Sequence, residues 1–174
     1  NPVQSYLTEY TGGGREQRTV KELLTHSAGY PPVFDFHRKD TQQGDALYSQ
    51  NSQTTKQLLL TKVPLNNKKP MQHVYSDIDY MILGVLVERI TGQPLDEYLE
   101  QHVYKPLALS NTLFNPLKKG FERSQFAATE LSGNTRDGRI TFDNIRTHVL
   151  QGQVHDERAF YSFGGVAGHA GLFS

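Results

Sequence analysis

The longest hydrophobic pattern in the chain lies in the stretch DIDYMILGVLVERITG, residues 77–92. Its apolar residues recur at helical spacing, and the resulting face is broad: Tyr80, Leu83, Val87 and Ile90, widened by Met81, Ile82 and Leu86. A stripe of this width predicts a helix over residues 77–91 that is packed on most sides. Gly84 lowers helix propensity by about 1 kcal/mol relative to alanine, so we expect another backbone to approach the helix closely there.

Weaker patterns on the amino-terminal side predict three further helices. A proline at position 2 favours a short helix over residues 2–7. Thr19 and Glu22 have capping-box spacing, which predicts a second helix that begins at residue 20 and ends near Gly29. Ser52 is placed to cap a third helix that runs through residue 61.

On the carboxyl-terminal side the pattern becomes shorter and more mixed. Pro94 opens a helix that we expect to reach about residue 103, and residues 111–116 favour a short extended piece. The Asp137-Gly138 pair predicts a hairpin that joins strands over residues 126–131 and 138–142. One or two helical turns are expected over residues 155–162. Together these elements predict an α+β chain that is rich in helix.

Composition narrows the classes of protein that the chain can belong to. The 174 residues suit one domain or part of a larger one, and 36% hydrophobic with 21% charged residues is typical of globular proteins. Eighteen basic and eighteen acidic residues balance, so we expect no nucleic-acid partner. Because the chain has no cysteine, disulfides and thiolate metal sites are excluded. No apolar run approaches the roughly 20 residues of a membrane span.

The first and last residues suggest that the sequence was cut from a longer protein. Asn1 is not an initiator methionine, and the chain stops inside the apolar stretch GHAGLFS rather than in a polar tail. We therefore expect residues 1–174 to be an internal segment of a larger domain. Any targeting sequence or membrane anchor would then lie outside the segment.

Tyr75, Ser76 and Asp77 stand together at the start of the long helix, and two interpretations fit them. In the first, Tyr75 packs, while Ser76 or Asp77 caps the helix and Asp77 suits its dipole. In the second, the buried helix fixes the direction of a tyrosine hydroxyl that faces a cleft. A tyrosine acts as a base where nearby cations lower its pKa from about 10. The pattern alone leaves both interpretations open.

Two histidine-containing stretches are candidates for chemical sites. The sequence His155-Asp156-Glu157 resembles a metal or acid–base cluster, but adjacent residues on a helix face different directions, so we expect no metal there. Asp156 is better placed to cap the helical turn that follows it. His26 comes one helical turn after Leu23, and we expect it to be buried with its hydrogen bonds satisfied.

Four motifs in order resemble the serine β-lactamase and penicillin-binding protein superfamily. They are NPVQSYLTEYTG, TVKELLTHSAGYPP, YSDIDYMILGVLVERITGQPLDEYLEQHVYKPLALSNTLFNP and GGVAGHAGLFS. The branch that the chain resembles most is that of the class C β-lactamase-like hydrolases, and VHDERAF with GGVAGHAGLFS looks most like the penicillin-binding protein 4B type. The resemblance implies the β-lactamase/transpeptidase-like fold, an antiparallel sheet with flanking helices plus a helical domain. Residues 1–174 would form mainly that helical domain, with a few short strands.

The resemblance also implies a catalytic set, of which this chain holds one part. Tyr75-Ser76-Asp77 occupies the place of the family's Tyr-x-Asn motif, so Tyr75 would be the acid–base group and Asp77 its neighbour in the site. Asp77 replaces the commoner asparagine, and an ionised aspartate only accepts hydrogen bonds. Asp79 stands where glycine is frequent. No Ser-x-x-Lys motif occurs within 1–174, so we expect it before Asn1 and the Lys-Thr-Gly-like motif after Ser174.

Three further residues would border the substrate in the resembled fold. Tyr30 and Phe34 in SAGYPPVF are candidate aromatics at the rim of the site, with ordinary loop packing as the alternative. His169 in GVAGHAG is a candidate substrate contact, with a structural role as the alternative. The glycines of that stretch indicate tight turns or close backbone contact.

The function that the resemblance implies is hydrolysis through an acyl-serine. We expect part of a penicillin-binding, serine-type D-alanyl-D-alanine carboxypeptidase-like enzyme without cofactor or metal, inactive as the isolated segment. Its expected partner is the peptidoglycan stem peptide or a β-lactam, and its expected location is the bacterial periplasm, with any membrane attachment outside the segment. An esterase or β-lactamase of the same fold, and a non-catalytic module that binds cell-wall peptide, remain open.

Overall fold

The structure is a computed structural model that describes residues 1–39, 45–66 and 73–174. Its α-helices are α1 (Val20–Leu24), α2 (Ser52–Thr61), α3 (Asp77–Thr91) and α4 (Leu95–Leu99). Four short strands follow: β1 (Leu113–Phe114), β2 (Ala128–Glu130), β3 (Leu150–Gln151) and β4 (Leu172–Phe173). Short 3-10 turns and two π-helical turns, Glu100–Tyr104 and Arg158–Ser162, complete the elements that bear on the site. The predicted α+β class is confirmed.

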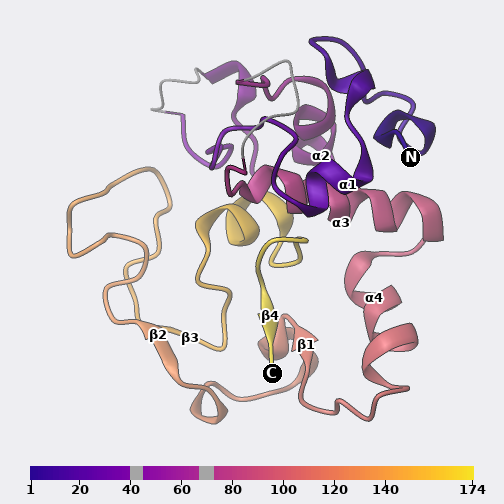
Figure 1. The fold of residues 1–174 in the computed structure, drawn as a ribbon. Helices are drawn as coiled ribbons and strands as arrows, with labels where there is room; N and C mark the ends of the chain where they lie inside the picture. Colours follow the sequence, from indigo (N-terminus) through magenta and orange to yellow (C-terminus); the bar gives the residue numbers. More distant parts are fainter. Residues whose placement is uncertain (40–44, 67–72) are drawn as a thin grey trace.

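Helix α3 is the centre of the molecule. Figure 1 shows α1 and α2 on one side of it and the yellow carboxyl-terminal segment on the other, while α4 continues from its end. Gly92 ends α3 in the left-handed conformation, with φ of 69°. The predicted bounds of α3 are confirmed.

The buried face of α3 differs from the predicted stripe. It is formed by Ile78, Asp79, Met81, Ile82, Gly84, Val85 and Leu86, whereas Ile90 is 57% exposed. The prediction is confirmed for Met81, Ile82 and Leu86, which are buried, but it was wrong for the main stripe of Tyr80, Leu83, Val87 and Ile90. Apolar residues surround most of this helix, so their spacing predicts that it is buried but not the direction of its inner face.

The predicted close approach at Gly84 is confirmed. A Cβ atom built on Gly84 would lie 3.0 Å from the backbone nitrogen of Gly168, and one on Gly168 would lie 2.0 Å from the carbonyl oxygen of Tyr80. The GHAG loop therefore rests directly on the helix backbone. This contact holds the carboxyl-terminal segment against residues 80–84 of α3.

The amino-terminal helices match their predictions in part. Thr19 and Glu22 form the expected reciprocal capping box on α1. However, α1 ends at Leu24, earlier than predicted, because His26 rather than Gly29 takes the first left-handed conformation after it, with φ of 51°. The first predicted helix is a short 3-10 turn, Val3–Ser5. Helix α2 is capped by the side chain of Asn51, so the expectation that Ser52 is the cap was wrong.

The predicted hairpin over residues 126–142 does not form. Strand β2 pairs instead with β3, and β1 pairs with β4, both antiparallel. The reason is Arg146, whose buried guanidinium bonds Asn134 Oδ1 and the carbonyls of Val154 and His155 and stacks on Phe160. These contacts of Arg146 hold the residues between β2 and β3 as a loop.

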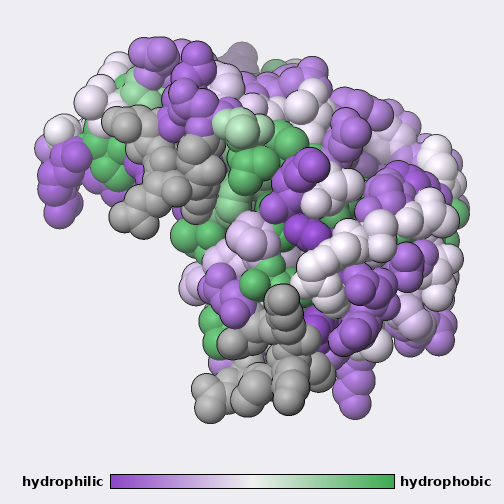
Figure 2. All heavy atoms as spheres, turned by 90° about the horizontal axis from the view of Figure 1, so that it is seen from above, coloured by the Kyte–Doolittle hydropathy of each residue, from purple (hydrophilic) through white to green (hydrophobic). Residues whose placement is uncertain are grey.

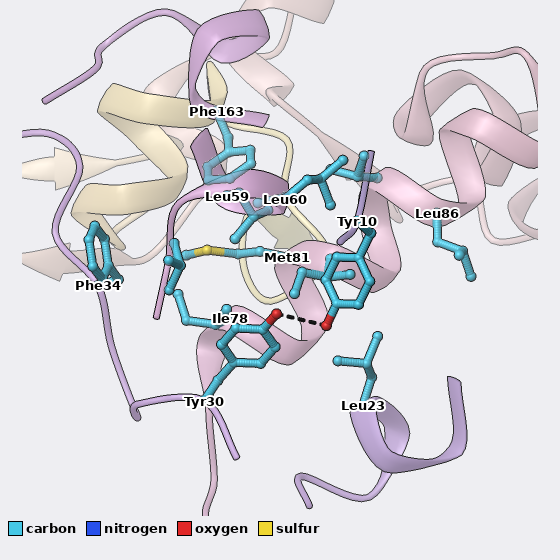
Figure 3. Packing of buried hydrophobic residues seen from close by; sticks show 14 of the residues in the cluster. Tyr10, Leu23, Tyr30, Phe34, Leu59, Leu60, Ile78, Met81, Leu86 and Phe163 are labelled. Atoms are coloured by element: carbon cyan, nitrogen blue, oxygen red, sulfur yellow. Dashed lines mark hydrogen bonds between the residues drawn. The ribbon is translucent and has the colours of Figure 1, made fainter. Parts of the chain in front are cut away.

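The core lies between α1, α2, α3 and the carboxyl-terminal segment. Figure 3 shows part of it, and its labelled members are Tyr10, Leu23, Tyr30, Phe34, Leu59, Leu60, Ile78, Met81, Leu86 and Phe163. Figure 2 shows that some hydrophobic side chains also reach one face, surrounded by hydrophilic ones. Among the described residues, no helix combines the length and apolar character that crossing a membrane requires.

Candidate active site

The Tyr75-Ser76-Asp77 corner is fixed to the segment that follows α1. Ser76 is fully buried, and its Oγ donates to the carbonyl oxygen of Pro31 at 2.6 Å. The backbone N–H of Asp77 donates to the carbonyl oxygen of Pro32 at 2.9 Å, and that of Val74 donates to the carbonyl oxygen of His26 at 2.8 Å. Ser76 is the residue before α3, but its side chain does not cap the helix. These bonds make the start of α3 a rigid corner.

Tyr75 projects from this corner toward solvent. Its side chain is 62% exposed, although a large aromatic side chain at a loop end usually packs. The ring rests on the imidazole of His26, with a centroid distance of 4.6 Å. His26 in turn contacts the ring of Tyr80 at 5.0 Å and that of His73 at 5.8 Å. The hydroxyl of Tyr75 is therefore accessible while its backbone and ring are held.

Asp77 belongs to a charged cluster that we call the Asp77 network: Asp77, Arg158, Asp35, Asp156 and His169. The Arg158 guanidinium lies 2.7 Å from Asp35, 3.4 Å from Asp156 and 4.0 Å from Asp77. His169 Nε2 lies 3.1 Å from Asp156 Oδ1. The network joins the start of α3 to the carboxyl-terminal segment. Asp77 therefore lies among these charged side chains as well as at the positive end of the helix dipole.

The carboxyl groups of the network differ in their proton affinity. Burial raises the pKa of Asp77, against the opposing charges of His169 and Arg158. For Asp156, burial also acts to raise the pKa, but the hydrogen bond and charge of His169 and the N–H of Ala159 outweigh it and hold the pKa well below its usual range. The predicted cap by Asp156 is confirmed, since Oδ1 accepts from the Ala159 N–H at 2.7 Å.

Three donor atoms of the network are close enough to be considered for a metal ion. Atoms of Asp77, Asp156 and His169 lie within 4.8 Å of one another. The guanidinium of Arg158 contacts both of those carboxyl groups and supplies the positive charge that a cation would bring. We therefore interpret the cluster as an ion-pair network and assign it no metal.

The side chains of the three residues proposed for the rim of the site are not exposed to solvent. Tyr30 and Phe34 are each only 2% exposed and belong to the core, so an exposed rim position was wrong for both and the packing alternative holds. The hydroxyls of Tyr30 and Tyr10 lie 2.7 Å apart (Figure 3), and burial raises the pKa of Tyr30 to about 12. The His169 side chain is 3% exposed and bonds Asp156. The structure brings His169 to Asp77, not to open solvent.

Sequence reasoning missed Arg158 and Asp35, and it interpreted His26 only as a satisfied buried histidine. Arg158 comes two residues after Asp156 in the sequence, which is a signal of proximity to that carboxylate but not to Asp35 or Asp77. The contact between His26 and Asp79 had no signal in the pattern, because His26 lies in the turn after α1 whereas Asp79 lies on α3.

Comparison with known proteins shows the family of the chain. A family model described as Beta-lactamase matches residues 1–174. The chain is 53% identical over 161 residues to an Escherichia coli K12 protein provisionally named a D-alanyl-D-alanine carboxypeptidase. It is 55% identical over the same length to a Bacillus subtilis protein named N-acetylmuramyl-L-alanine amidase. Each match covers 92% of this chain and 36% of the relative.

Solved structures show the same fold at lower identity. An octameric penicillin-binding protein homologue from Pyrococcus abyssi aligns over 100% of this chain and 35% of its own, with a TM-score of 0.62 and 19% identity. A beta-lactamase/D-alanine carboxypeptidase from Pseudomonas syringae aligns over 99% of this chain and 39% of its own, with a TM-score of 0.60 and 19% identity. The chain thus spans little more than a third of the curated relatives named above. It belongs to the beta-lactamase family.

Proposed function

We propose that residues 1–174 supply the tyrosine of a serine acyl-transfer hydrolase. The carrying observation is Tyr75, which is 62% exposed on a corner that backbone and Ser76 hydrogen bonds hold in place. In the reaction, Tyr75 accepts the proton of a serine hydroxyl as the serine attacks an amide carbonyl. It then passes that proton to the leaving amine, and water later releases the acyl group from the serine.

The serine and its lysine come from parts of the protein outside this chain in our proposal. No Ser-x-x-Lys motif occurs within 1–174, and the chain spans 36% of its two curated relatives. The lysine cation would favour the phenolate form of Tyr75. Backbone N–H groups would stabilise the oxyanion, at least one of them at the serine. No step of this reaction requires a cofactor or metal.

We assign Asp77 a positioning role in this site. Its carboxyl group faces Arg158 and lies near Asp156 and His169. An ionised carboxylate accepts hydrogen bonds where asparagine would also donate one. Asp77 is thus suited to accept from the lysine of the Ser-x-x-Lys motif or from a substrate amide N–H, while Arg158 balances its charge.

We propose a cell-wall peptide that ends in D-alanyl-D-alanine as the substrate, with β-lactams as mimics that acylate the same serine. The Escherichia coli relative and the Pseudomonas syringae structure both have names that refer to carboxypeptidases of this kind. Such a substrate places the protein outside the cytoplasm, in the periplasm of a bacterium that has one. Membrane attachment, if present, would lie outside the chain.

A second candidate activity follows from the Bacillus subtilis relative. That protein is named an N-acetylmuramyl-L-alanine amidase, and it is as similar to this chain as the carboxypeptidase relative is. An amidase of that name would cleave the bond between muramic acid and L-alanine, so the whole stem peptide would be released instead of one D-alanine. The acyl-serine chemistry proposed for Tyr75 applies to either amide bond, so the released product distinguishes the two activities.

The test uses the full-length protein that contains this chain. After incubation with a penicillin, intact-mass spectrometry should show the addition of one drug molecule, and the isolated segment should show none. Digestion of muropeptides should release free D-alanine. Release of intact stem peptide without a penicillin adduct would favour the amidase. Absence of both adduct and product would contradict the proposed activity and leave an esterase or a peptide-binding module.

A further inference from the structure

One nitrogen atom beneath Tyr75 makes two contacts. His26 Nδ1 lies 3.2 Å from the backbone nitrogen of Ser76 and 3.2 Å from Oδ2 of Asp79. The other side of the same imidazole carries the ring of Tyr75 at 4.6 Å. His26 is held in a left-handed conformation, with φ of 51°, which is uncommon for residues other than glycine. The position of this ring therefore affects both the backbone and the side chain of the candidate base.

The two contacts fix where the protons are. A backbone N–H can only donate, so the Nδ1 atom that faces Ser76 must carry its lone pair. The contact between Nδ1 and Asp79 then needs a donor on the carboxyl side, which means that Asp79 holds a proton. An ionised Asp79 would instead require a proton on Nδ1, and the Ser76 N–H would lose its acceptor.

The surroundings of Asp79 favour the protonated form. Its side chain is 1% exposed, and Oδ1 has no hydrogen-bond partner among the described residues. Burial raises the pKa of Asp79 to about 7, and burial with the charge of His73 lowers that of His26. The titratable groups that face this pair are Tyr10, Tyr30, His73, Tyr75, Asp77 and Tyr80. None of these is a permanent cation that would hold Asp79 ionised.

We propose that His26 and protonated Asp79 are positioning residues for Tyr75. Asp79 donates to His26 Nδ1, which keeps that nitrogen an acceptor for the Ser76 N–H and keeps the imidazole beneath the Tyr75 ring. When Asp79 releases its proton to solvent, the single ring proton of His26 moves from Nε2 to Nδ1 and pairs with the carboxylate. The Ser76 N–H then loses its acceptor, and the corner that carries Tyr75 loosens. The catalytic consequence rests on the proposed function of Tyr75.

The first test reads the tautomer of His26 and needs no activity. The full-length protein is labelled with 15N-histidine, and a His26→Gln variant identifies the resonances. At about pH 6 we expect an unprotonated Nδ1, and above the pKa of Asp79 a protonated Nδ1. In Asp79→Asn the amide donates at every pH, so Nδ1 should stay unprotonated. A protonated Nδ1 at about pH 6, or no change of tautomer between about pH 6 and 9, would overturn the proposal.

The second test measures how the rate of acylation by a penicillin depends on pH, because that rate depends on the position of Tyr75. The ratio of the wild-type rate to the Asp79→Asn rate should fall about tenfold between about pH 6 and pH 8, because misplaced catalytic groups slow reactions steeply. A Glu97→Gln control, at an exposed site on α4, should keep the wild-type profile. Superimposable profiles for wild type and Asp79→Asn would overturn the positioning role. If the wild type is not acylated at all, the proposed function fails, while the tautomer measurement still decides the protonation of Asp79.

Discussion

At the residue scale, the candidate site depends on buried polar groups that have few partners. Ser76 is fully buried and donates to a single carbonyl, while buried Asp79 has His26 as its hydrogen-bond partner among the described residues. A buried polar group left without a partner costs about 1–3 kcal/mol. Such groups hold Tyr75 in place, and they also make the corner sensitive to a change in protonation.

The stability of the protein should therefore depend on pH through Asp79. Its folded-state pKa is raised to about 7 from 3.8 by burial. The protonated Asp79 therefore makes its full contribution to the free energy of unfolding below the unfolded-state pKa. This contribution is lost as the pH rises through 7. Asp79→Asn should thus gain stability relative to wild type between about pH 5 and pH 8. Each pKa unit is worth about 1.36 kcal/mol, so we expect a change above about 1 kcal/mol in urea unfolding. A constant difference between the two proteins would contradict this account.

The motif located Tyr75 and Asp77 in the sequence, but burial could not be predicted for their aromatic neighbours. An aromatic residue after a helix end suits a site rim and a core equally well. Tyr30 is in the core because its hydroxyl meets that of Tyr10, a residue from another segment. Likewise, Arg158 meets Asp35 only after the carboxyl-terminal segment has folded against α3. Contacts between distant segments carry no periodic signal along the chain.

At the element scale, α3 and the GHAG loop act as one unit. Their backbones approach so closely at Gly84 and Gly168 that a side chain on either has little or no space. The same loop carries His169 to Asp156 and so closes the Asp77 network. Local patterns predicted α3 because its apolar run is long. They failed for residues 138–142, because the buried side-chain contacts of Arg146 that hold this stretch as a loop leave no periodic pattern in the sequence.

Gly168→Ala should destabilise the protein through this contact. Its Cβ would lie 2.0 Å from the carbonyl oxygen of Tyr80, so the loop must move away from α3. Overpacking of this kind costs about 1–3 kcal/mol, and we expect the upper end in urea unfolding of the full-length protein. Gly12→Ala is the control, since its Cβ meets no atom within 4 Å. That control loses only about 1 kcal/mol, from its positive φ. Equal losses for the two variants would show that the close approach is unimportant.

At the scale of the whole molecule, we propose that the chain is one wall of a divided site. It spans 36% of its two curated relatives, and it contains the tyrosine corner without a Ser-x-x-Lys motif. The folded core around α3 gives this wall its rigidity, and the remaining groups of the reaction come from elsewhere in our proposal. The central claim is therefore that Tyr75 moves protons for a serine that lies outside residues 1–174.

The most direct measurement is the rate of acylation by a penicillin in the full-length protein that carries Tyr75→Phe. This change removes one hydroxyl and keeps the ring on His26. A Tyr98→Phe variant, which removes a hydroxyl from α4, is the matched control. General acid–base catalysis contributes about 10²–10⁴-fold, so the account predicts at least a 100-fold slower acylation for Tyr75→Phe and an unchanged rate for Tyr98→Phe. Equal rates for Tyr75→Phe and wild type would remove Tyr75 from the mechanism and contradict the account.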